Sequence, residues 1–261
     1  MFYAINQHPK VQGGKFDLCS IKACISGSAP LHPEIKAEFE RLTGGKLVEG
    51  YGLSEAPTAT HCNPVFGKNT PGSIGLPLPD VMCKVVDLET GEREVPTGEL
   101  GELAIKGPQV MAGYHNQPEE DKIALREGWL YTGDVVRMDE EGYFYLVDRK
   151  KSLIKVSGFQ VWPNEIELVI LSYPGISACA VGGVPDKKQG EKVIAWVVKK
   201  PDTTMSEESI KAWSRERLVN YKVPSEIQFR EQLPSSGVGK ILRRELIREY
   251  IEKETSCSEV S

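Results

Sequence analysis

The sequence has no apolar run long enough to cross a membrane and no surplus of basic residues. A spanning helix needs about 20 consecutive apolar residues, and no stretch approaches that length. The formal net charge is -5 at pH 7, so the basic surface that binds nucleic-acid phosphates is missing. Residues 1–10 also lack the charged and apolar regions of a signal peptide. We expect a cytoplasmic protein that binds no nucleic acid and has no transmembrane segment, with peripheral membrane contact left open.

Cysteine and histidine occur only in patterns that carry no recognisable chemistry. The six cysteines include no C-x-x-C pair, and none has a histidine at metal-ligand spacing. The four histidines stand apart, and no G-x-S-x-G nucleophile elbow or G-x-x-x-x-G-K-[ST] phosphate loop occurs. Hydrolase and metalloenzyme functions are therefore unsupported, and the thiols are expected to be reduced and structural.

Hydrophobic patterning predicts three successive regions. Residues 1–66 predict an α/β segment, with strands at 21–26 and 46–52 around a helix that begins at Pro33 and stops at the glycines after residue 43. Residues 67–148 change to short strands separated by turns, a spacing typical of a small β-barrel or sandwich.

The third region, residues 149–261, returns to alternating helices and strands and predicts a small α+β domain. A boundary near Asp148 therefore separates residues 1–148 from residues 149–261. The final helix is expected to carry one apolar face, formed by Leu242, Leu246, Ile247, Tyr250 and Ile251. The predicted fold class is α/β followed by α+β.

Two segments of residues 1–148 place polar groups beside glycines. In EGYGLSEAPT, the residues Tyr51, Ser54 and Glu55 follow a predicted strand end, where ligands of open α/β folds tend to bind. In GWLYTGDVV, the carboxylate of Asp134 offers two acceptor oxygens to a vicinal diol. The alternatives are a tight turn with an exposed glutamate and an ordinary turn aspartate.

Two further segments carry cations. The stretch VDRKKSLIKVSG interleaves apolar residues with Arg149, Lys150, Lys151 and Lys155. In PSSGVGKILRREL, Lys240 lies on a glycine-flanked loop before a helix, where a lysine is a mobile point charge able to reach an anion. The alternatives are a solvated basic hairpin and a plain loop before a helix.

Taken in order, these segments resemble the adenylate-forming superfamily: acyl- and aryl-CoA synthetases, firefly luciferase and the adenylation domains of peptide synthetases. The resemblance is carried by the series ISGSAPL, EGYGLSE, GSIGLPLPD, GELAIKGPQVMAGY, GWLYTGD, DRKKSLIKVSGFQVWPNEIE and PSSGVGKILRREL. It implies an AMP-forming acid–thiol ligase that makes an acyl-adenylate from a carboxylate and ATP with Mg²⁺, then transfers the acyl group to coenzyme A. Long-chain fatty acyl-CoA ligases are most similar, and a coumarate-type aryl-CoA ligase is the alternative.

The resemblance also implies roles for residues of the nucleotide site. Gly27, Ser28 and Ala29 match the loop that lines the adenine and acyl pocket, and Tyr51, followed by Gly52, matches the aromatic residue that packs on adenine. The remaining matches are a hydroxyl for the α-phosphate, a Mg²⁺ carboxylate and two ribose-binding residues, which are in turn Ser54, Glu55, Asp134 and Arg149.

The cations receive separate roles from the same resemblance. Lys151 matches the hinge of a mobile C-terminal domain, and Lys240 matches the lysine that serves adenylation. Lys155 and Gly158 match the face used for thioester formation, with Gly158 leaving room for the pantetheine arm of coenzyme A. Lys150 is expected to be solvated.

The chain departs from complete family members in length. Such members are about twice as long and carry a Ser/Thr/Gly-rich phosphate loop before the GSAPL segment, and no such loop occurs here. We therefore expect the C-terminal half of a ligase, with its N-terminal half as the missing partner and apolar surface exposed in residues 1–60. Whether Met1 is the native start stays open, and a non-catalytic remnant that binds nucleotide or a partner is a further alternative.

Overall fold

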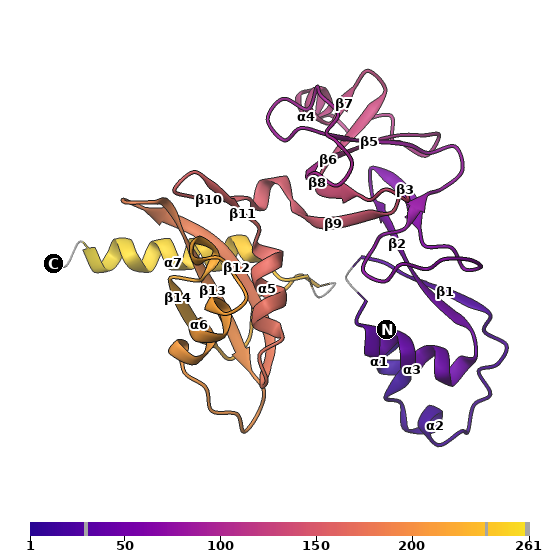
Figure 1. Ribbon diagram of the computed structural model, residues 1–261, viewed down its shortest axis with the longest axis horizontal. Coiled ribbons are helices and arrows are strands. Elements are labelled where there is room, and N and C mark those ends of the chain that lie inside the picture. The colour runs from indigo at the N-terminus through magenta and orange to yellow at the C-terminus, as the bar shows by residue number, and fades with distance from the viewer. Residues whose placement is uncertain (29–30, 238–239, 259–261) are drawn as a thin grey trace. The chain divides into compact units, whose positions relative to one another are not determined.

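The computed structural model describes residues 1–28, 31–237 and 240–258, which form two compact units (Figure 1). Unit 1 is Met1–Leu146 and unit 2 is Val147–Ser261. Both units mix helices with strands, so the predicted combination of α/β and α+β architecture is confirmed. In the described part of the chain, no helix has the length and apolar character needed to cross a bilayer.

A four-stranded sheet organises the first half of unit 1, in the order β1-β2-β3-β4. Strands β1 and β2 pair in parallel, whereas β2–β3 and β3–β4 pair antiparallel. The strands are β1 (Ala23–Ser26), β2 (Lys46–Leu53), β3 (Ala56–Cys62) and β4 (Leu76–Pro77). The helices are α1 (Phe2–Asn6), α2 (Pro9–Gln12) and α3 (Pro33–Thr43).

Helix α3 connects the parallel pair and follows the sequence signals at both ends. Pro33 occupies the first turn, where its missing N–H leaves no bond unmade. Gly44 ends the helix in the left-handed region, with φ of 69°. Between them, Phe39 is 1% exposed and its ring meets that of Phe2 edge-on at 4.9 Å.

Strand β1 stands at the end of the sheet order, with β2 as its sole partner strand among residues 1–28 and 31–237. Ile25 on this strand is 57% exposed, and Tyr3 and Phe16 are exposed as well. These side chains agree with the apolar surface predicted for residues 1–60. Exposed strand edges of this kind are sites where further strands can add.

A five-stranded antiparallel sheet forms the second half of unit 1, as the β-rich pattern predicts. Its linear order is β5-β6-β8-β7, with β9 also pairing with β8. The strands are β5 (Met82–Val86), β6 (Gly101–Lys106), β7 (Leu125–Arg126), β8 (Trp129–Met138) and β9 (Phe144–Arg149), and α4 (Pro118–Ala124) precedes β7. Its buried core includes Leu103, Ile105, Val136 and Phe144.

Unit 2 contains a sheet in the order β11-β10-β13-β12, with β14 parallel to β13. The strands are β10 (Ile154–Val156), β11 (Phe159–Val161), β12 (Ile176–Asp186), β13 (Gly190–Lys199) and β14 (Glu226–Arg230). The helices are α5 (Pro163–Leu171), α6 (Glu207–Arg215) and α7 (Arg243–Ser258), with 3-10 turns η1 (Lys150–Ser152) and η2 (Asn220–Lys222).

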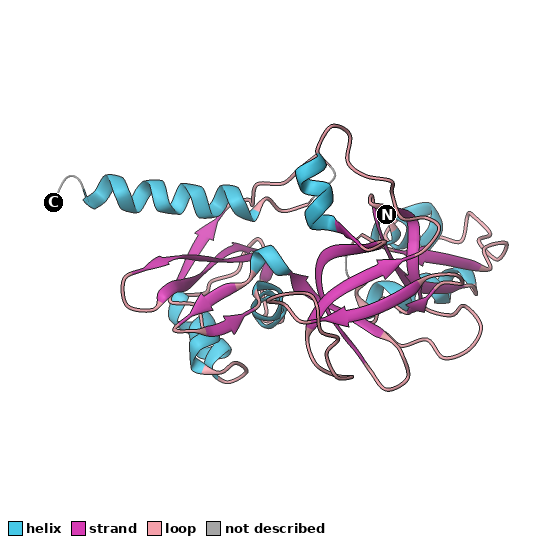
Figure 2. Ribbon diagram, turned by 90° about the horizontal axis from the view of Figure 1, so that it is seen from above, coloured by secondary structure: helices cyan, strands magenta, loops and turns pink. Residues whose placement is uncertain are grey.

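Alternating side chains of β13 bury both faces of this sheet. Val193 and Val197 belong to the cluster under α5 and α6, whereas Trp196 packs with Leu246 of α7. Figure 2 shows α7 on one side of the strands and the shorter helices on the other. Ile251, which the helical period places on the same face of α7 as Leu246 and Tyr250, is 39% exposed.

Candidate active site

Tyr51 and Asp134 are in direct contact in unit 1, although they lie 83 residues apart in sequence. The Tyr51 hydroxyl donates a hydrogen bond to Asp134 Oδ2. Tyr51 is 8% exposed and Asp134 2% exposed, so this bond is shielded from water. The structure thus brings together two residues that the sequence assigned to adenine and ribose.

The backbone around Asp134 is fixed by residues of the neighbouring strand β6. The Gly133 N–H donates to Glu102 Oε1 at 3.0 Å, and Gly133 has φ of 69°. Thr132 Oγ1 accepts from the Asp134 N–H at 3.1 Å and donates to the Leu103 carbonyl at 2.8 Å. The Thr-Gly-Asp segment is therefore an ordered irregularity of β8, of the kind that redirects a side chain.

Ser54 and Glu55 form the tip of the β2–β3 hairpin. Ser54 is exposed and Glu55 is half-buried. Tyr114 donates its hydroxyl to Glu55 Oε1 at 2.8 Å, and the Met111 N–H donates to the Glu55 carbonyl at 2.8 Å. Burial and this bond raise the pKa of Tyr114 to about 12. Hydrogen bonds consequently hold Glu55 at both its backbone carbonyl and its side-chain carboxylate.

Tyr114 is a residue that sequence reasoning missed. It closes the motif GELAIKGPQVMAGY, so a signal for its importance was present. Nothing in the sequence linked that motif to Glu55, however, because 59 residues separate the two side chains. Only the folded structure shows that the Tyr114 hydroxyl orients the carboxylate of Glu55, the group proposed to hold Mg²⁺.

Glycine is required near this hairpin because backbone segments approach closely. A Cβ atom at Gly52 would lie 2.3 Å from the Thr58 carbonyl oxygen, and one at Gly27 would lie 3.1 Å from the Gly50 carbonyl oxygen. Ser28, which follows the end of β1, has φ of 69°. Ala29, predicted for the same loop, lies outside the described residues.

His61 is the second residue that sequence reasoning missed, since it was treated as isolated. It pairs across the hairpin with Tyr51, and its ring lies 5.8 Å from the Tyr51 ring and 4.8 Å from the Phe144 ring. Burial lowers the pKa of His61 to about 4. Nε2 is 3.4 Å from the sulfur of Cys83, whose own pKa burial raises to about 12. A neutral imidazole therefore supports the Tyr51 ring.

In unit 2, Lys155 and Gly158 lie on the β10–β11 hairpin. Ile154 and Val156 are buried, whereas Lys155 between them is exposed, and its N–H donates to Glu191 Oε2 at 2.7 Å. Gly158 has φ of 84° after a residue that is also left-handed, as a tight two-residue hairpin requires. A Cβ atom on Gly158 would meet no atom within 4 Å in the described structure.

The other cations of unit 2 lie at segment ends. Arg149 is the last residue of β9 and is half-buried, and Lys151 is exposed within η1. Lys240 is exposed on the loop before α7, where its N–H donates to Ser236 Oγ at 3.2 Å and its carbonyl accepts from the Ser236 N–H at 2.8 Å. Lys240 is thus placed by hydrogen bonds of its backbone.

A single carboxylate fits the chemistry of Mg²⁺ bound with a nucleotide. No group of three or more potential metal-ligating side chains occurs among the residues that the structure describes. Mg²⁺ is commonly held by one or two carboxylates together with substrate phosphates. The anchored Glu55 meets this requirement without a further acidic ligand.

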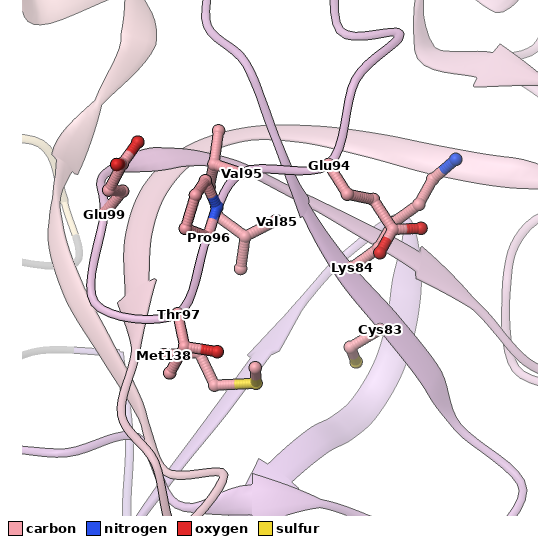
Figure 3. Close-up of a pocket in the computed structure, with 9 residues that line it drawn as sticks. All are labelled: Cys83, Lys84, Val85, Glu94, Val95, Pro96, Thr97, Glu99 and Met138. Atoms are coloured by element: carbon pink, nitrogen blue, oxygen red, sulfur yellow. The ribbon is translucent and has the colours of Figure 1, made fainter.

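A small cavity in the second sheet of unit 1 does not coincide with these residues (Figure 3). Its volume is about 80 Å³, and its lining residues include Cys83, Glu94, Glu99 and Met138. Ligand pockets usually measure about 300–1,000 Å³, so this cavity is too small for a nucleotide. None of the residues predicted for the site lines it.

Two family sequence profiles match the chain. The profile described as AMP-binding enzyme matches residues 1–115, and the profile described as AMP-binding enzyme C-terminal domain matches residues 165–240. The chain belongs to the AMP-binding enzyme family. The predicted resemblance to adenylate-forming enzymes is thereby confirmed.

Relatives of this chain agree with that assignment. The long-chain-fatty-acid–CoA ligase of Bacillus subtilis is 50% identical over 252 residues, which cover 97% of this chain and 44% of the relative. The feruloyl-CoA synthase of Amycolatopsis is 38% identical, covering 96% of this chain and 50% of the relative. The crystal structure of ATP-bound MatB from Rhodopseudomonas palustris aligns with a TM-score of 0.84 and 35% identity, covering 95% of this chain and 49% of that chain. The chain therefore spans about half the length of the relatives it matches.

Proposed function

We propose that the chain carries the nucleotide site and the two catalytic lysines of an ATP-dependent acid–thiol ligase. The proposed reaction converts a fatty acid, ATP and coenzyme A into acyl-CoA, AMP and diphosphate through an acyl-adenylate. The hydrogen bond between Tyr51 and Asp134 is the main support, because it joins an aromatic ring suited to adenine to a carboxylate suited to ribose hydroxyls.

In the proposed nucleotide site, the Tyr51 ring packs on adenine while Asp134 and Arg149 bind the ribose. Asp134 shares its acceptor positions between the Tyr51 hydroxyl and the ribose, since a carboxylate has about four lone-pair sites. The exposed Ser54 hydroxyl donates to the α-phosphate. Glu55, oriented by Tyr114, holds Mg²⁺, which neutralises phosphate charge when bound.

Lys240 and Lys155 serve different half-reactions in this proposal. During adenylation the substrate carboxylate forms a bond to the α-phosphorus and diphosphate leaves, while Lys240 stabilises the negative charge that develops on the α-phosphate. During thioester formation, the face with Lys155 and Gly158 receives coenzyme A, whose sulfur displaces AMP. Lys151 is the pivot for the change between the two arrangements.

A fatty acid is the proposed acyl substrate, with an aromatic acid as the alternative. The relative that is 50% identical is named a long-chain-fatty-acid–CoA ligase, which favours the fatty acid. The relative that is 38% identical is named a feruloyl-CoA synthase, which supports an aromatic acid as the alternative substrate. In both cases the carboxylate and the first half-reaction are the same.

Carboxylate-dependent exchange of diphosphate into ATP tests this function. It is measured on the chain alone and on a chimera in which the chain follows the region of the Bacillus subtilis ligase that precedes the matched residues. We expect exchange by the chimera with hexadecanoate and little with ferulate, whereas the reverse preference would support the aromatic alternative. A folded chimera without exchange on either acid would contradict the proposal and favour a non-catalytic, nucleotide-binding role.

A further inference from the structure

Unit 2 contains an ionic cluster in which the half-buried Arg243 meets the buried carboxylates of Glu167 and Asp148. Arg243 Nε donates to Glu167 Oε1 at 2.9 Å, and Nη2 donates to Oε2 at 2.6 Å. The Asp148 Oδ1 atom is 3.7 Å from Arg243 Nη1. Glu167 is 8% exposed and Asp148 7% exposed. This paired, two-bond geometry depends on the planar guanidinium group of arginine.

Each carboxylate also fixes the backbone of another element. Glu167 Oε1 accepts from the Val181 N–H of β12 at 2.7 Å. Asp148 Oδ2 accepts from the Asn164 N–H in the first turn of α5 at 2.9 Å, and Oδ1 accepts from the Arg149 N–H at 2.7 Å. Through Arg243 the start of α7 is therefore joined to α5, β12 and the end of β9.

The energetics of the cluster indicate a role in geometry. Removing charges from water costs free energy that their mutual attraction often fails to recover. Well-packed apolar side chains of similar volume therefore commonly stabilise a fold at least as well as a buried ion pair. A cation in the first turn of a helix is also disfavoured by the helix dipole. Arg243 occupies that first turn, so its location is explained better by what it holds in place.

The position of Arg243 in the sequence connects the cluster to Lys240. Arg243 follows Lys240 by three residues. The base of the loop that carries Lys240 is closed by a bond from the Leu242 N–H to the Pro234 carbonyl at 2.8 Å. Through Glu167 the cluster thus holds the end of this loop against α5 and β12.

We propose that Arg243 is a positioning residue that joins residues 240–242 to α5 and β12 through Glu167, so that Lys240 moves as one rigid body with α5 and β12. The link itself belongs to unit 2, whereas its catalytic meaning rests on the proposed function of Lys240. Arg243 touches no reacting atom in this role and acts through the backbone of residues 240–242.

Amide hydrogen exchange in the chain tests the structural link. Arg243→Lys keeps the charge but loses the two-bond fork, and we expect exchange at the Lys240 and Leu242 amides to rise about tenfold with β12 and β13 unchanged. Arg230→Gln is the matched control, because it breaks a 3.1 Å ion pair between Arg230 and Glu249 farther along α7. Equal exchange at residues 240–242 in both variants, or a rise spread over the whole of unit 2, would overturn the proposal.

The double variant Glu167→Gln with Arg243→Gln separates positioning from the cost of an unpaired buried charge. It removes the guanidinium without leaving Glu167 ionised and unpaired, so we expect a smaller loss of thermal stability than for Arg243→Gln alone. The fast exchange at residues 240–242 should persist in the double variant. Restored protection there would mean that Arg243 acts only through charge balance, and the positioning role would be wrong.

The catalytic meaning is tested in the chimera with the Bacillus subtilis ligase. We expect Arg243→Lys to lower kcat for adenylate formation about tenfold, leave KM for ATP unchanged and spare thioester formation from a supplied acyl-adenylate. A raised KM with unchanged kcat, or equal losses in both half-reactions, would contradict this role. If the parent chimera shows no exchange while the hydrogen-exchange result holds, the proposed function fails and the link does not.

Discussion

The two units hold their candidate catalytic groups in different ways. In unit 1, Tyr51, Asp134 and Glu55 are fixed by side-chain hydrogen bonds that cross 83 and 59 residues of sequence. In unit 2, Lys155 is exposed on strand β10 and Lys240 is exposed on the loop before α7, and the hydrogen bonds found for them in the described structure fix their backbones. The unit 1 groups are fixed as far as the ends of their side chains, whereas the unit 2 lysines are fixed at the main chain.

This difference matches the tasks proposed for the two sets. A nucleotide site benefits from groups whose geometry is fixed before the ligand arrives, because ordering them costs free energy. A lysine that reaches a phosphate in one half-reaction and withdraws in the other benefits from a long, mobile side chain on a fixed base. Substitutions in unit 1 should therefore disturb structure together with binding, and substitutions of the unit 2 lysines should disturb chemistry alone.

The largest expected contrast concerns two glycines. Gly52→Ala in unit 1 places a Cβ atom 2.3 Å from the Thr58 carbonyl oxygen, and we expect it to lower the free energy of unfolding by about 3 kcal/mol. In the described structure a Cβ atom on Gly237, in the loop before Lys240, would meet no atom within 4 Å, so Gly237→Ala should change stability by less than about 0.5 kcal/mol. Urea unfolding of both variants measures this contrast. Similar losses at the two positions would remove it.

The next effect is a pH dependence that comes from His61 in unit 1. Its pKa is lowered to about 4 in the folded state, against about 6.5 in an unfolded chain. The unfolded state therefore binds more protons between these values, so stability is full above about pH 6.5 and falls as the pH drops toward 4. We expect a loss of about 2 kcal/mol between pH 7 and pH 5 from this group.

Unfolding at these two pH values in His61→Gln and His115→Gln measures the contribution. The neutral amide at position 61 should flatten the pH dependence, whereas replacing the exposed His115 should leave it as in the parent chain. The same slope in all three proteins would assign the pH dependence to other groups. Burial of His61 beside Tyr51 would then have no measurable electrostatic cost.

The smallest expected effect concerns Tyr114. Tyr114→Phe removes the bond to Glu55. We expect half-maximal exchange to need about a tenfold higher Mg²⁺ concentration, since hydrogen-bond partners of metal ligands usually contribute this much to metal affinity. Tyr145→Phe, which removes a 2.9 Å bond to Asp139, is the matched control. Because the pKa of Tyr114 is about 12, the parent protein should keep its Mg²⁺ affinity up to about pH 10.

Equal Mg²⁺ titrations of Tyr114→Phe and Tyr145→Phe would show that Glu55 needs no side-chain support. They would also weaken the distinction between the two units, since Glu55 would then be fixed only by its backbone, as Lys240 is.

Local signals in the sequence predicted much of the fold. Pro33 and Gly44 mark both ends of α3, because each acts through its own backbone geometry. Ser206 likewise caps α6 by accepting from the Ser209 N–H. In β10 the apolar Ile154 and Val156 are buried and Lys155 between them is exposed, as their alternation in the sequence favours.

Features that depend on contacts between residues distant in sequence could not be predicted from local patterns. Strand β3 contains Pro57 and small polar residues, so it lacks the alternation that marks a strand, and pairing with β2 creates it. The bonds made by Tyr114 and Arg243 likewise join residues that no local pattern connects. Ile251 follows the helical period of α7 but lies beyond Tyr250, the last of the buried residues in that cluster.

The proposal that unit 2 supplies separate lysines to two half-reactions is the central claim, and a crossover experiment in the chimera tests it most directly. Adenylate formation and thioester formation from a supplied acyl-adenylate are measured for Lys240→Ala, Lys155→Ala and the exposed control Lys188→Ala. We expect Lys240→Ala to lose about 100-fold or more in adenylation only, Lys155→Ala to lose thioester formation only, and Lys188→Ala to match the parent. Equal losses in both half-reactions for either lysine would contradict the account.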